Sequence, residues 1–397
     1  MTQLPYTSQM GMFDRLVYKL FQQAYNGSLK VVLPNNKTLT IGEGDQACQL
    51  IVKKWRFFAS VLLEGTNGVC KSYIRGDLVC DDLLGLFKWG LENQKLLDKQ
   101  KSNHAILKFI RFIKHQQNKN TLKGSRKNIS YHYDLGNDFY DKWLDKTMTY
   151  SSALYLNQDD TLEQAQANKY QFIIDQLDSK KDETVLEIGL GWGGFSRQLL
   201  AQKPVEYTGV SLSKEQLVVA NEKCEHPSKA DFRYQDYRDL EGKFDKIVSI
   251  EMFEAVGQEY WDTYFQKLNT LLNVNGKAIL QVITIKENRF ERYQKDMDFI
   301  QKYIFPGGML PTNQIMHELS DQYKFKVVDQ LNFGLDYAKT LQQWWESFNA
   351  QWDEIKPLGY DDEFKNMWNL YLKYCQAGFE SKNIDVRIYV LEKQDEL

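Results

Sequence analysis

The sequence predicts an α/β protein with a mostly parallel sheet and a smaller amino-terminal α+β domain. The chain of 397 residues is long enough for two domains. From about residue 126 onward, strand-like apolar runs alternate with helical patterns, and one of these runs passes directly into a glycine-rich loop. In such folds, ligands bind at the carboxyl ends of the strands. We place the boundary near residue 120, which gives domains 1–120 and 121–397.

The amino-terminal domain mixes helical and strand-like patterns and carries no catalytic motif. Residues 12–25 have apolar side chains at helical spacing, and residues 81–93 form a second amphipathic pattern. Residues 28–34 and 37–44 alternate like strands around a Pro-Asn-Asn turn. We therefore expect two helices and a pair of strands in this domain.

A strongly basic segment leads into the second domain. Residues 95–127 contain ten Lys or Arg and a single acid, Asp98. Within this segment, residues 104–115 place apolar side chains at helical spacing, with Lys108, Arg111 and Lys114 between them. Such a helix could rest on anionic lipid headgroups, or it could be a solvated inter-domain helix packed on one side. The pattern supports both interpretations equally.

The second domain alternates strands with helices. Six expected strands lie at residues 184–189, 205–213, 230–237, 276–285, 325–334 and 385–393. A further strand, the fourth in chain order, begins residues 244–256, which run from a strand into a helix. A helix is expected from Lys214, and another directly after the fourth strand. This alternation is typical of α/β winding, so the loops that follow the strands should lie along one edge of the sheet.

Composition excludes several classes of function. The net charge of −3 gives no reason to expect nucleic acid as a partner. The five cysteines and five histidines form no C-x-x-C or H-x-x-x-H pair, so we expect no metal and no disulfide framework. No apolar run of about 18 residues and no signal peptide is present, which predicts a cytoplasmic protein.

The glycine-rich loop is the first candidate binding element. Gly189, Gly191, Gly193 and Gly194 follow the strand that contains Glu187. Glycines allow positive φ and let a ligand approach the backbone closely. The usual dinucleotide fingerprint is absent, so the loop favours S-adenosylmethionine over a dinucleotide. The alternative is a purely structural turn from strand to helix.

Other polar side chains follow the later strands. The second strand ends at Ser211, the third leads to Asp236 and Tyr237, and the fifth contains Gln281. After the fourth strand come two carboxylates three positions apart, Glu251 and Glu254. Each residue alone is more often structural than functional, but together they fall at the edge expected to bind a ligand.

These residues also carry a family resemblance. The stretch from Tyr131 to Leu391 resembles the cyclopropane-fatty-acyl-phospholipid synthases and the related mycolic acid cyclopropane synthases, which are class I methyltransferases that use S-adenosylmethionine. The matching segments are YHYDLGNDFY (131–140), MTYSSALY (148–155), VLEIGLGWGG, GVSLSKEQ, QDYRDL, SIEMFEAVG, DFIQKYIFPGGMLP (298–311), LNFGLDY (331–337) and YLKYCQAGF (371–379). The long amino-terminal domain is similar to that of the bacterial phospholipid enzymes.

The resemblance implies addition of a methylene group across a cis double bond of a phospholipid acyl chain. Methyl transfer from the sulfonium donor leaves a carbocation, which aromatic faces can stabilise and an apolar tunnel can shield from water. A base must then remove one proton so that the ring closes. In the family this base is thought to be a bound bicarbonate ion.

The family's anion site carries over with two departures. Glu254, Tyr337 and Ile283 match it directly, Ser152 replaces a cysteine, and Gln281 replaces a histidine. A glutamine amide still donates a hydrogen bond but does not titrate. Cys375 matches a cysteine that has been regarded as catalytic, but no partner stands in motif relation to it, so we interpret it as structural. The implied cofactor contacts are Tyr133, Tyr150, Ser151, Glu187, Gly189, Gly191, Ser211, Leu212, Gln216, Asp236 and Tyr237.

We therefore expect a peripheral membrane enzyme whose partners are the phospholipid surface and its unsaturated acyl chains. A homodimer would gain avidity from two membrane contacts, although the sequence leaves the oligomeric state open. One alternative is a small-molecule N-methyltransferase of the same fold. Another is a non-catalytic lipid-binding protein, which measurable binding of S-adenosylmethionine would argue against.

Overall fold

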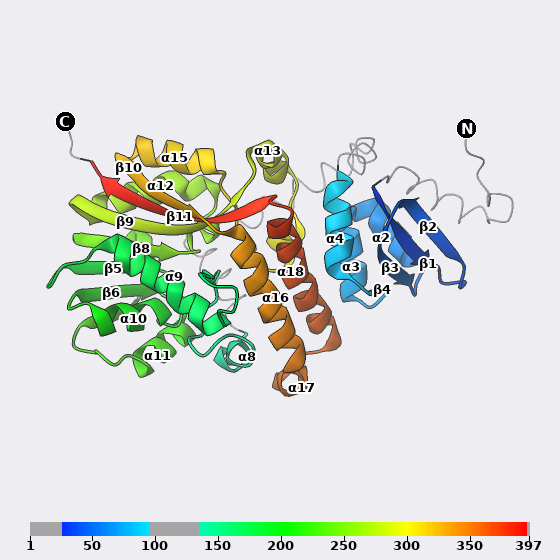
Figure 1. Cartoon of the computed structure of the whole chain (residues 1–397), viewed down its shortest axis with the longest axis horizontal. Coiled ribbons are helices and arrows are strands. Elements are labelled where there is room, and N and C mark those ends of the chain that lie inside the picture. The colour runs from blue at the N-terminus through cyan, green and yellow to red at the C-terminus, as the bar shows by residue number, and fades with distance from the viewer. Residues whose placement is uncertain (1–25, 95–134, 395–397) are drawn as a thin grey trace. The chain divides into compact units, whose positions relative to one another are not determined.

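The chain forms two compact units, and the computed structural model describes residues 26–94 and 135–394 (Figure 1). The described part of the first unit is residues 26–94 together with Tyr360–Ser381. The second unit comprises the described residues 135–359 and those from Lys382 onward. The helices expected at residues 12–25 and 104–115, and the boundary expected near residue 120, lie outside the described residues.

The first unit is built on a four-stranded sheet in the order β2-β1-β3-β4. Strand β1 (Gly27–Val32) pairs antiparallel with β2 (Thr38–Glu43) and parallel with β3 (Gln46–Val52), and β3 pairs antiparallel with β4 (Leu78–Cys80). Its helices are α2 (Arg56–Glu64), α3 (Thr66–Ile74), α4 (Leu83–Glu92) and α18 (Asp362–Glu380). The two strands and the second helix expected here are confirmed, whereas β3, β4, α2 and α3 were not predicted.

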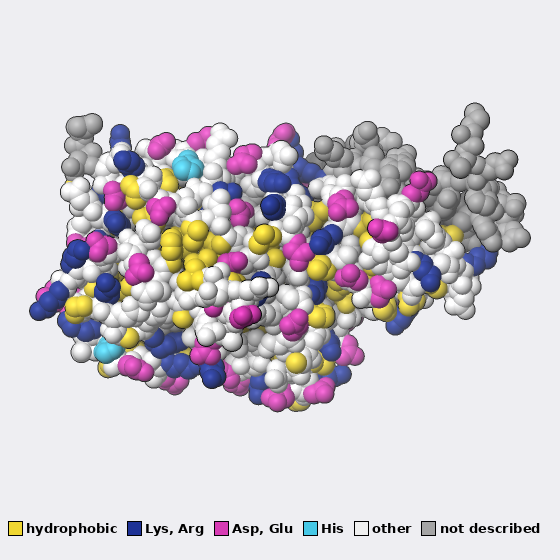
Figure 2. Space-filling view, in the orientation of Figure 1, with side chains coloured by type: hydrophobic (Ala, Val, Ile, Leu, Met, Phe, Trp, Pro, Cys, Tyr) yellow, Lys and Arg dark blue, Asp and Glu magenta, His cyan; other side chains and the backbone are white. Residues whose placement is uncertain are grey.

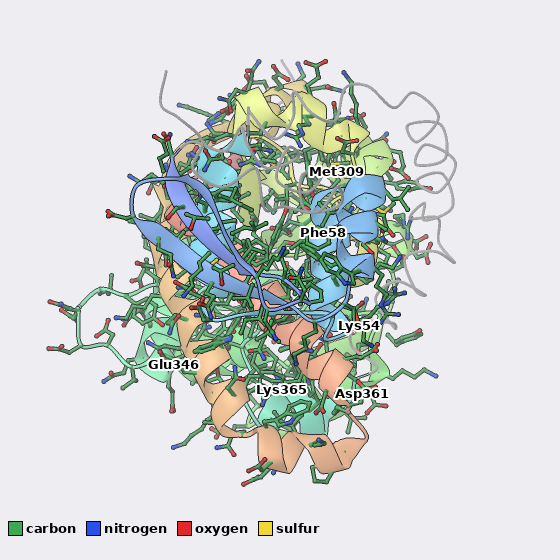
Figure 3. All side chains as sticks on the ribbon, turned by 90° about the vertical axis from the view of Figure 1, so that its right-hand side faces the viewer. Lys54, Phe58, Met309, Glu346, Asp361 and Lys365 are labelled. Atoms are coloured by element: carbon green, nitrogen blue, oxygen red, sulfur yellow. The ribbon has the colours of Figure 1, made fainter. Side chains whose placement is uncertain are left out.

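Helix α18 belongs to the first unit although it lies near the carboxyl end of the chain. Asp361, labelled in Figure 3, caps this helix by accepting a hydrogen bond from Phe364 N at 2.8 Å. Lys88 on α4 bonds Glu380 on α18 at 2.7 Å, and the rings of Phe87 and Tyr374 meet edge to face at 5.2 Å. Residues 360–381 thus join the first unit, which the sequence did not indicate, because a helix face packs against whichever partner face the fold offers.

The second unit contains a seven-stranded sheet in the order β10-β11-β9-β8-β5-β6-β7. The strands are β5 (Thr184–Ile188), β6 (Glu206–Ser211), β7 (Ala230–Tyr234), β8 (Phe244–Ile250), β9 (Leu272–Ile285), β10 (Phe325–Asn332) and β11 (Ile384–Lys393). The pairs from β9 through β8, β5 and β6 to β7 are parallel, and β11 runs antiparallel to both neighbours. All seven expected strands are confirmed, as is the mostly parallel sheet.

Helices accompany this sheet along its length (Figure 1). They are α8 (Asn137–Asp141), α9 (Leu162–Leu177), α10 (Gly194–Gln202), α11 (Lys214–Glu222), α12 (Trp261–Leu271), α13 (Glu287–Lys295), α14 (Phe299–Tyr303), α15 (Asn313–Gln322), α16 (Gly334–Ala350) and α17 (Trp352–Ile355). Helices α10 and α11 contact β6, α12 contacts β9, and α15 contacts β10. The helix expected after the fourth strand is a single 3-10 turn, Phe253–Ala255.

The strand order determines where a ligand can bind. Strand β5 lies between β6 and β8, which is the point where the strand order reverses. In open α/β sheets, ligands bind in a crevice at the carboxyl ends of the strands at such a point. Basic and acidic side chains intermingle on the face shown in Figure 2, in keeping with the net charge of −3. Within residues 26–94 and 135–394, none of the helices has the length and apolar character needed to cross a membrane.

Candidate active site

The glycine-rich loop lies between β5 and α10 at the expected crevice. Gly189 (φ +87°) and Leu190 donate their N–H groups to Val210 O of β6, which fastens the loop to the neighbouring strand. Gly191 has a φ of +54°, and a Cβ built on it would meet no atom within 4 Å. The open space beside this backbone fits the approach of a ligand such as S-adenosylmethionine.

Behind the loop, Glu187 is buried and accepts a hydrogen bond from the hydroxyl of Tyr207. Burial raises the pKa of Glu187 to about 8. Its carboxyl group is therefore bonded to a neighbouring strand inside the sheet. A direct contact of Glu187 with the cofactor stays a prediction.

The polar groups after β6 form a connected network. Ser211 Oγ donates to Gln216 Oε1 at 2.8 Å and accepts from Ser213 N at 3.0 Å. Ser213 in turn caps α11 by accepting from Gln216 N. Leu212 lies between the two serines, half-buried. The network holds three of the predicted cofactor contacts, Ser211, Leu212 and Gln216, at the carboxyl end of β6.

The pair predicted to contact adenine is already engaged with protein groups. Both oxygens of the buried Asp236 bond the guanidinium of Arg238, at 2.9 and 2.7 Å. The ring of Tyr237 packs against Tyr264 at 5.3 Å between centroids and belongs to the core. A carboxylate has capacity for further donors, so Asp236 remains suited to an amino group. Tyr237 is held mainly by core packing.

A buried lysine, not singled out from the sequence, lies behind Ser151. Lys169 Nζ of α9 donates to Ser151 Oγ at 2.6 Å, and Gln166 Nε2 donates to Ser151 O at 2.9 Å. Burial lowers the pKa of Lys169 to about 7, although the charges of Glu251 and Glu187 oppose this shift. Lys169 therefore positions the serine predicted to meet the carboxylate of the cofactor's methionine part.

The groups predicted to hold an anion converge on a carboxylate of the chain itself. Glu251 Oε1 accepts from Ser152 N at 2.8 Å and from Gln281 Nε2 at 2.7 Å. Glu251 Oε2 accepts from the hydroxyl of Tyr337 at 2.7 Å. The donors come from the segment before α9, from β9 and from α16. Two features of the sequence could have indicated this arrangement. Gln281 stands where the family has a histidine, and a second carboxylate, Glu251, lies near Glu254.

Glu251 has an unusual backbone conformation. It follows the last residue of β8 with a φ of +50°, in the left-handed region that favours glycine. A side chain there costs about 1–2 kcal/mol. Glu251 N donates to Gln281 O at 2.8 Å, which extends the pairing of β8 with β9 by one residue. The sheet therefore holds the residue in place against this strain.

Glu254 lies one turn further along the chain. One of its oxygens accepts from Ile283 N, and the other, Oε2, is buried without a hydrogen-bond partner. Burial raises the pKa of Glu254 to about 8, and the nearby charge of Glu251 raises it further. At neutral pH, Glu254 is therefore largely a carboxylic acid beside the carboxyl group of Glu251, and its unpartnered oxygen is available to a ligand.

A cluster of aromatic rings packs around Tyr337, whose hydroxyl bonds Glu251. The rings of Tyr337 and Trp344 meet edge to face, with 6.0 Å between their centroids. The ring centroids of Trp344 and Tyr150 lie 5.2 Å apart. Tyr150 also contacts Tyr140 at 5.4 Å and Trp143 at 5.6 Å. The faces of such rings attract cations, so this surface suits a positively charged reaction intermediate. The indole Nε1 of Trp344 and Gln281 Oε1 are buried without partners, as is typical of sites that receive a ligand.

Two of the predicted site residues remain, Tyr133 and Cys375. Tyr133 falls outside the described residues. Cys375 is a half-buried cysteine on α18, in the first unit, whereas the other described candidates lie in the second. Any part that either residue plays in the site stays a prediction.

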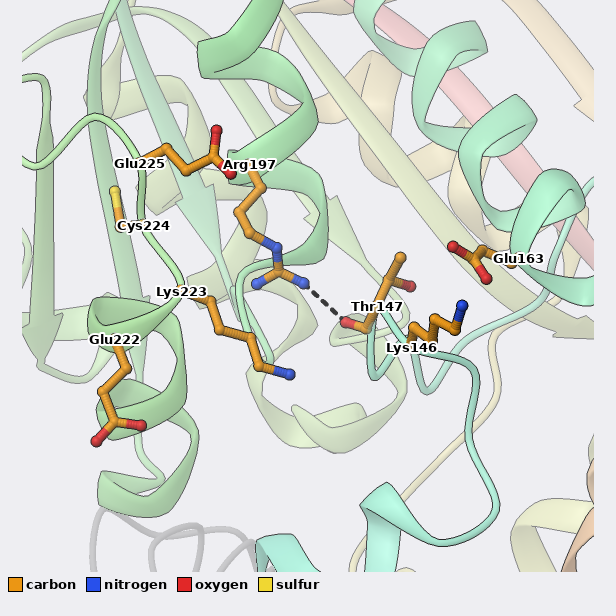
Figure 4. A pocket seen from close by; sticks show the side chains of 8 residues that line it. All are labelled: Lys146, Thr147, Glu163, Arg197, Glu222, Lys223, Cys224 and Glu225. Carbon is orange, nitrogen blue, oxygen red and sulfur yellow. Dashed lines mark hydrogen bonds between the residues drawn. The ribbon is translucent and has the colours of Figure 1, made fainter.

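A surface pocket of about 490 Å³ contains none of the predicted site residues (Figure 4). Its lining is largely charged and comprises Lys146, Thr147, Glu163, Arg197, Glu222, Lys223, Cys224 and Glu225. Arg197 closes one side by donating to Thr147 O at 2.9 Å, the bond drawn in Figure 4. Such a lining is unsuited to an acyl chain.

One cluster in the first unit has the composition of a metal site. The side-chain ligand atoms of Cys48, Cys80 and Asp81 lie within 4.8 Å of one another. The hydrogen bond to Cys80 and burial raise the pKa of Cys48 well above its ordinary value, so it is a thiol rather than the thiolate that a metal requires. Asp81 Oδ1 already accepts from Gln49 N at 2.7 Å. The absence of a metal stays a prediction.

The seven-stranded sheet, its glycine-rich loop and the polar groups at its strand ends define a class I S-adenosylmethionine-dependent methyltransferase. The chain belongs to the family of mycolic acid cyclopropane synthetases, whose family model matches residues 120–389. It is 37% identical over 348 residues to the cyclopropane-fatty-acyl-phospholipid synthase of Escherichia coli K12, covering 86% of this chain and 87% of the relative. These findings confirm the family that the sequence motifs indicated.

Further relatives widen the range of related activities. The tuberculostearic acid methyltransferase UfaA1 of Mycobacterium tuberculosis is 37% identical over 287 residues, covering 68% of this chain and 66% of the relative. The cyclopropane synthase MmaA2 of M. tuberculosis matches with a TM-score of 0.64 and 29% identity, covering 68% of this chain and 98% of that one. The cyclopropane synthase CmaA1, complexed with SAH and CTAB, matches with a TM-score of 0.63, 29% identity and the same coverage.

Proposed function

We propose that this protein transfers a methylene group from S-adenosylmethionine to a cis double bond in an acyl chain of a phospholipid. The observation that carries the proposal is the half-buried carboxylate pair, Glu251 and Glu254, beside the ring of Tyr337. Met252, which lies between the two carboxylates in the chain, packs against Gly189 of the glycine-rich loop. An alkene needs a strong electrophile, a site that tolerates a carbocation and a base. The family relatives named for cyclopropane synthesis support the same conclusion.

The cofactor would lie along the carboxyl ends of β5, β6 and β7. When bound, S-adenosylmethionine supplies an electrophilic methyl group. The backbone beside Gly191 leaves room for it, and Ser151 and Asp236 offer polar groups to its two ends. The faces of Tyr337 and Trp344 stabilise the positive charge that develops on the acyl chain. The carboxylate pair then accepts the proton that must leave.

The family resemblance implies a bicarbonate ion as base, held by Ser152, Gln281 and Tyr337. These three groups donate to Glu251, so a free ion would compete with this carboxylate for the same donors. Peripheral association with the membrane, a cytoplasmic location and a homodimer are further parts of the proposal, and the basic segment at residues 95–127 supports the first.

The test is the product formed by purified protein with S-adenosylmethionine and vesicles of cis-unsaturated phospholipid. We expect acyl chains heavier by one CH₂, with the double bond consumed and cyclopropyl protons visible by NMR. Vesicles of fully saturated phospholipid are the control and should yield nothing. Methyl groups found on an amine or a hydroxyl would refute the proposal.

A second candidate is methylation of the acyl chain without ring closure. The relative named as a tuberculostearic acid methyltransferase favours it, since the same cation can lose a proton from the chain instead of from the new methyl group. That product would also be heavier by one CH₂ but would keep a double bond. The N-methyltransferase alternative has weaker support, because the match to coclaurine N-methyltransferase is only 17% identical and shows the fold alone.

A further inference from the structure

We propose that the carboxylate of Glu251 is the base of this reaction and takes the place that the family resemblance assigns to a free bicarbonate ion. This inference rests on the proposed function and deepens it. It makes the base a part of the chain, so the reaction becomes independent of dissolved bicarbonate.

The first argument is the arrangement of donors. The N–H of Ser152, the amide of Gln281 and the hydroxyl of Tyr337 all donate to Glu251, at 2.7–2.8 Å. Glu251 presents the same flat O–C–O group as bicarbonate, so one carboxylate satisfies the donors that a free ion would need. With these donors engaged, a second anion at this place would also meet repulsion from Glu251.

The second argument is the backbone. Glu251 has a φ of +50°, a conformation that glycine adopts freely and a glutamate adopts only at a cost. Residues held in such conformations cluster at functional sites, where the surrounding structure maintains them. Here the strain directs the side chain from the end of β8 towards the three donors. A role in chemistry explains why a large charged residue stands at a position suited to glycine.

The third argument is the distribution of charge. Burial raises the pKa of Glu251, whereas the bonds from Tyr337 and Ser152 and the charge of Lys169 act against that rise. Glu254 has no comparable set of donors, and burial and the charge of Glu251 raise its pKa to about 8. The three donors therefore favour the ionised form of Glu251 over that of Glu254, and Glu251 is the partner better suited to accept a proton.

The step balances without a further reactant. The S–CH₃ bond breaks with its electron pair left on sulfur, and the π pair of the alkene forms the first new C–C bond. The new methyl group then gives a proton to an oxygen of Glu251, and the electrons of that C–H bond form the second C–C bond, which closes the ring. The proton later passes from Glu251 to solvent.

The decisive variant is Glu251→Gly, which removes the carboxylate, leaves space among the donors and relieves the left-handed strain. We expect a loss of about 100-fold or more in cyclopropane formation in bicarbonate-free buffer, the scale of general base catalysis. Added bicarbonate should restore at least about a tenth of the wild-type rate by occupying the vacated place. The wild-type rate should change less than about twofold between the two buffers.

Two further variants control the interpretation. Glu251→Gln keeps the shape of the side chain but cannot take up a proton, so this variant should be inactive. Because its amide fills the space among the donors, added bicarbonate should not rescue it. Asp178→Gly relieves the same kind of left-handed strain (φ +47°) on the exposed C-cap of α9 and should match the wild type in both buffers. Binding of S-adenosylmethionine, measured by calorimetry, should stay within a few-fold in all three variants.

Distinct outcomes would overturn the two proposals. A wild-type enzyme that loses activity without bicarbonate and regains it on addition would make the free ion the base. A Glu251→Gly variant that is fully active in bicarbonate-free buffer would also remove Glu251 from this role. A wild-type protein that makes no cyclopropane lipid in either buffer would refute the proposed function itself, together with this assignment.

Discussion

Replacing Tyr337 with phenylalanine removes one hydroxyl and leaves the ring against Trp344 in place. The hydroxyl donates to Glu251 Oε2 at 2.7 Å and favours the ionised carboxylate. Without this donor, the pKa of Glu251 rises further, because only the charged form gains from the bond. If Glu251 is the base, the variant holds a larger protonated, inactive fraction at any given pH on the acid side.

The size of the effect follows from the kind of bond. A hydrogen bond to a charged group contributes about 1.5–3 kcal/mol, which corresponds to about 10- to 150-fold in the protonation equilibrium. Two donors, Ser152 N and Gln281 Nε2, remain on the other oxygen, so the lower half of this range is the better expectation. The rate should fall by about 10- to 30-fold on the acid side, and the loss should shrink as the pH rises.

The assay is the rate of cyclopropane lipid formation over a range of pH, with wild type and variant on the same vesicles. The acid limb of the variant's profile should lie at higher pH. Tyr389→Phe is the matched control, because its hydroxyl bonds Asn313 Oδ1 at 2.9 Å, away from the carboxylate pair. Its profile should overlie that of the wild type. If the acid limb of the Tyr337→Phe profile does not move, the reasoning is refuted, whatever the maximal rate of the variant.

Three further predictions test other parts of the site. Glu254→Gln should abolish turnover while affinity for S-adenosylmethionine stays within a few-fold. Because the folded pKa of Glu254 is about 8 against an ordinary 4.5, the wild type loses stability as the pH rises through this window. Denaturant unfolding should therefore show a stability advantage of Glu254→Gln that grows from pH 4.5 to 8 and then levels off, and a constant difference would contradict the shift. Gly191→Ala places a methyl group in the open cradle and should weaken cofactor binding by at least about tenfold in calorimetry, whereas Gly242→Ala, also at positive φ with no neighbour within 4 Å, should bind normally. Lys108, Arg111 and Lys114 changed together to Gln should reduce sedimentation with anionic vesicles, more so at low salt, and unchanged binding would leave this segment a linker.

Much of the fold could be predicted from local patterns. Strands β5 to β11 were expected from apolar runs between turn residues, and the glycine loop from its composition, because both signals are local in the chain. The first unit was harder. Strand β4 has three residues, too few for a periodic signal, and α2 and α3 were missed. Helix α18 is amphipathic, yet its local sequence does not indicate which surface its apolar face will cover.

The candidate site likewise contains residues that the sequence indicated and residues that only the structure revealed. The sequence alone pointed to Ser152, Gln281, Ile283, Tyr337 and Glu254 through a family resemblance, and their roles stay predictions. It did not point to Lys169, whose long side chain lies buried among polar groups. Nor did it give Glu251 a role beyond that of one of two neighbouring carboxylates.

The sequence by itself determined the α/β class, the seven strands, the loop suited to S-adenosylmethionine and the family. Only the tertiary structure decided which group the converging donors hold. Ser152 and Tyr337 lie 99 and 86 positions from Glu251 in the chain. Tyr337 meets Glu251 because β8 pairs with β9, β9 pairs with β11, and α16 packs against β11. A hydrogen bond requires an approach of about 3 Å in a set direction, and no local pattern encodes such a distance. The resemblance led us to expect a free anion at this place, and the folded chain puts its own carboxylate there.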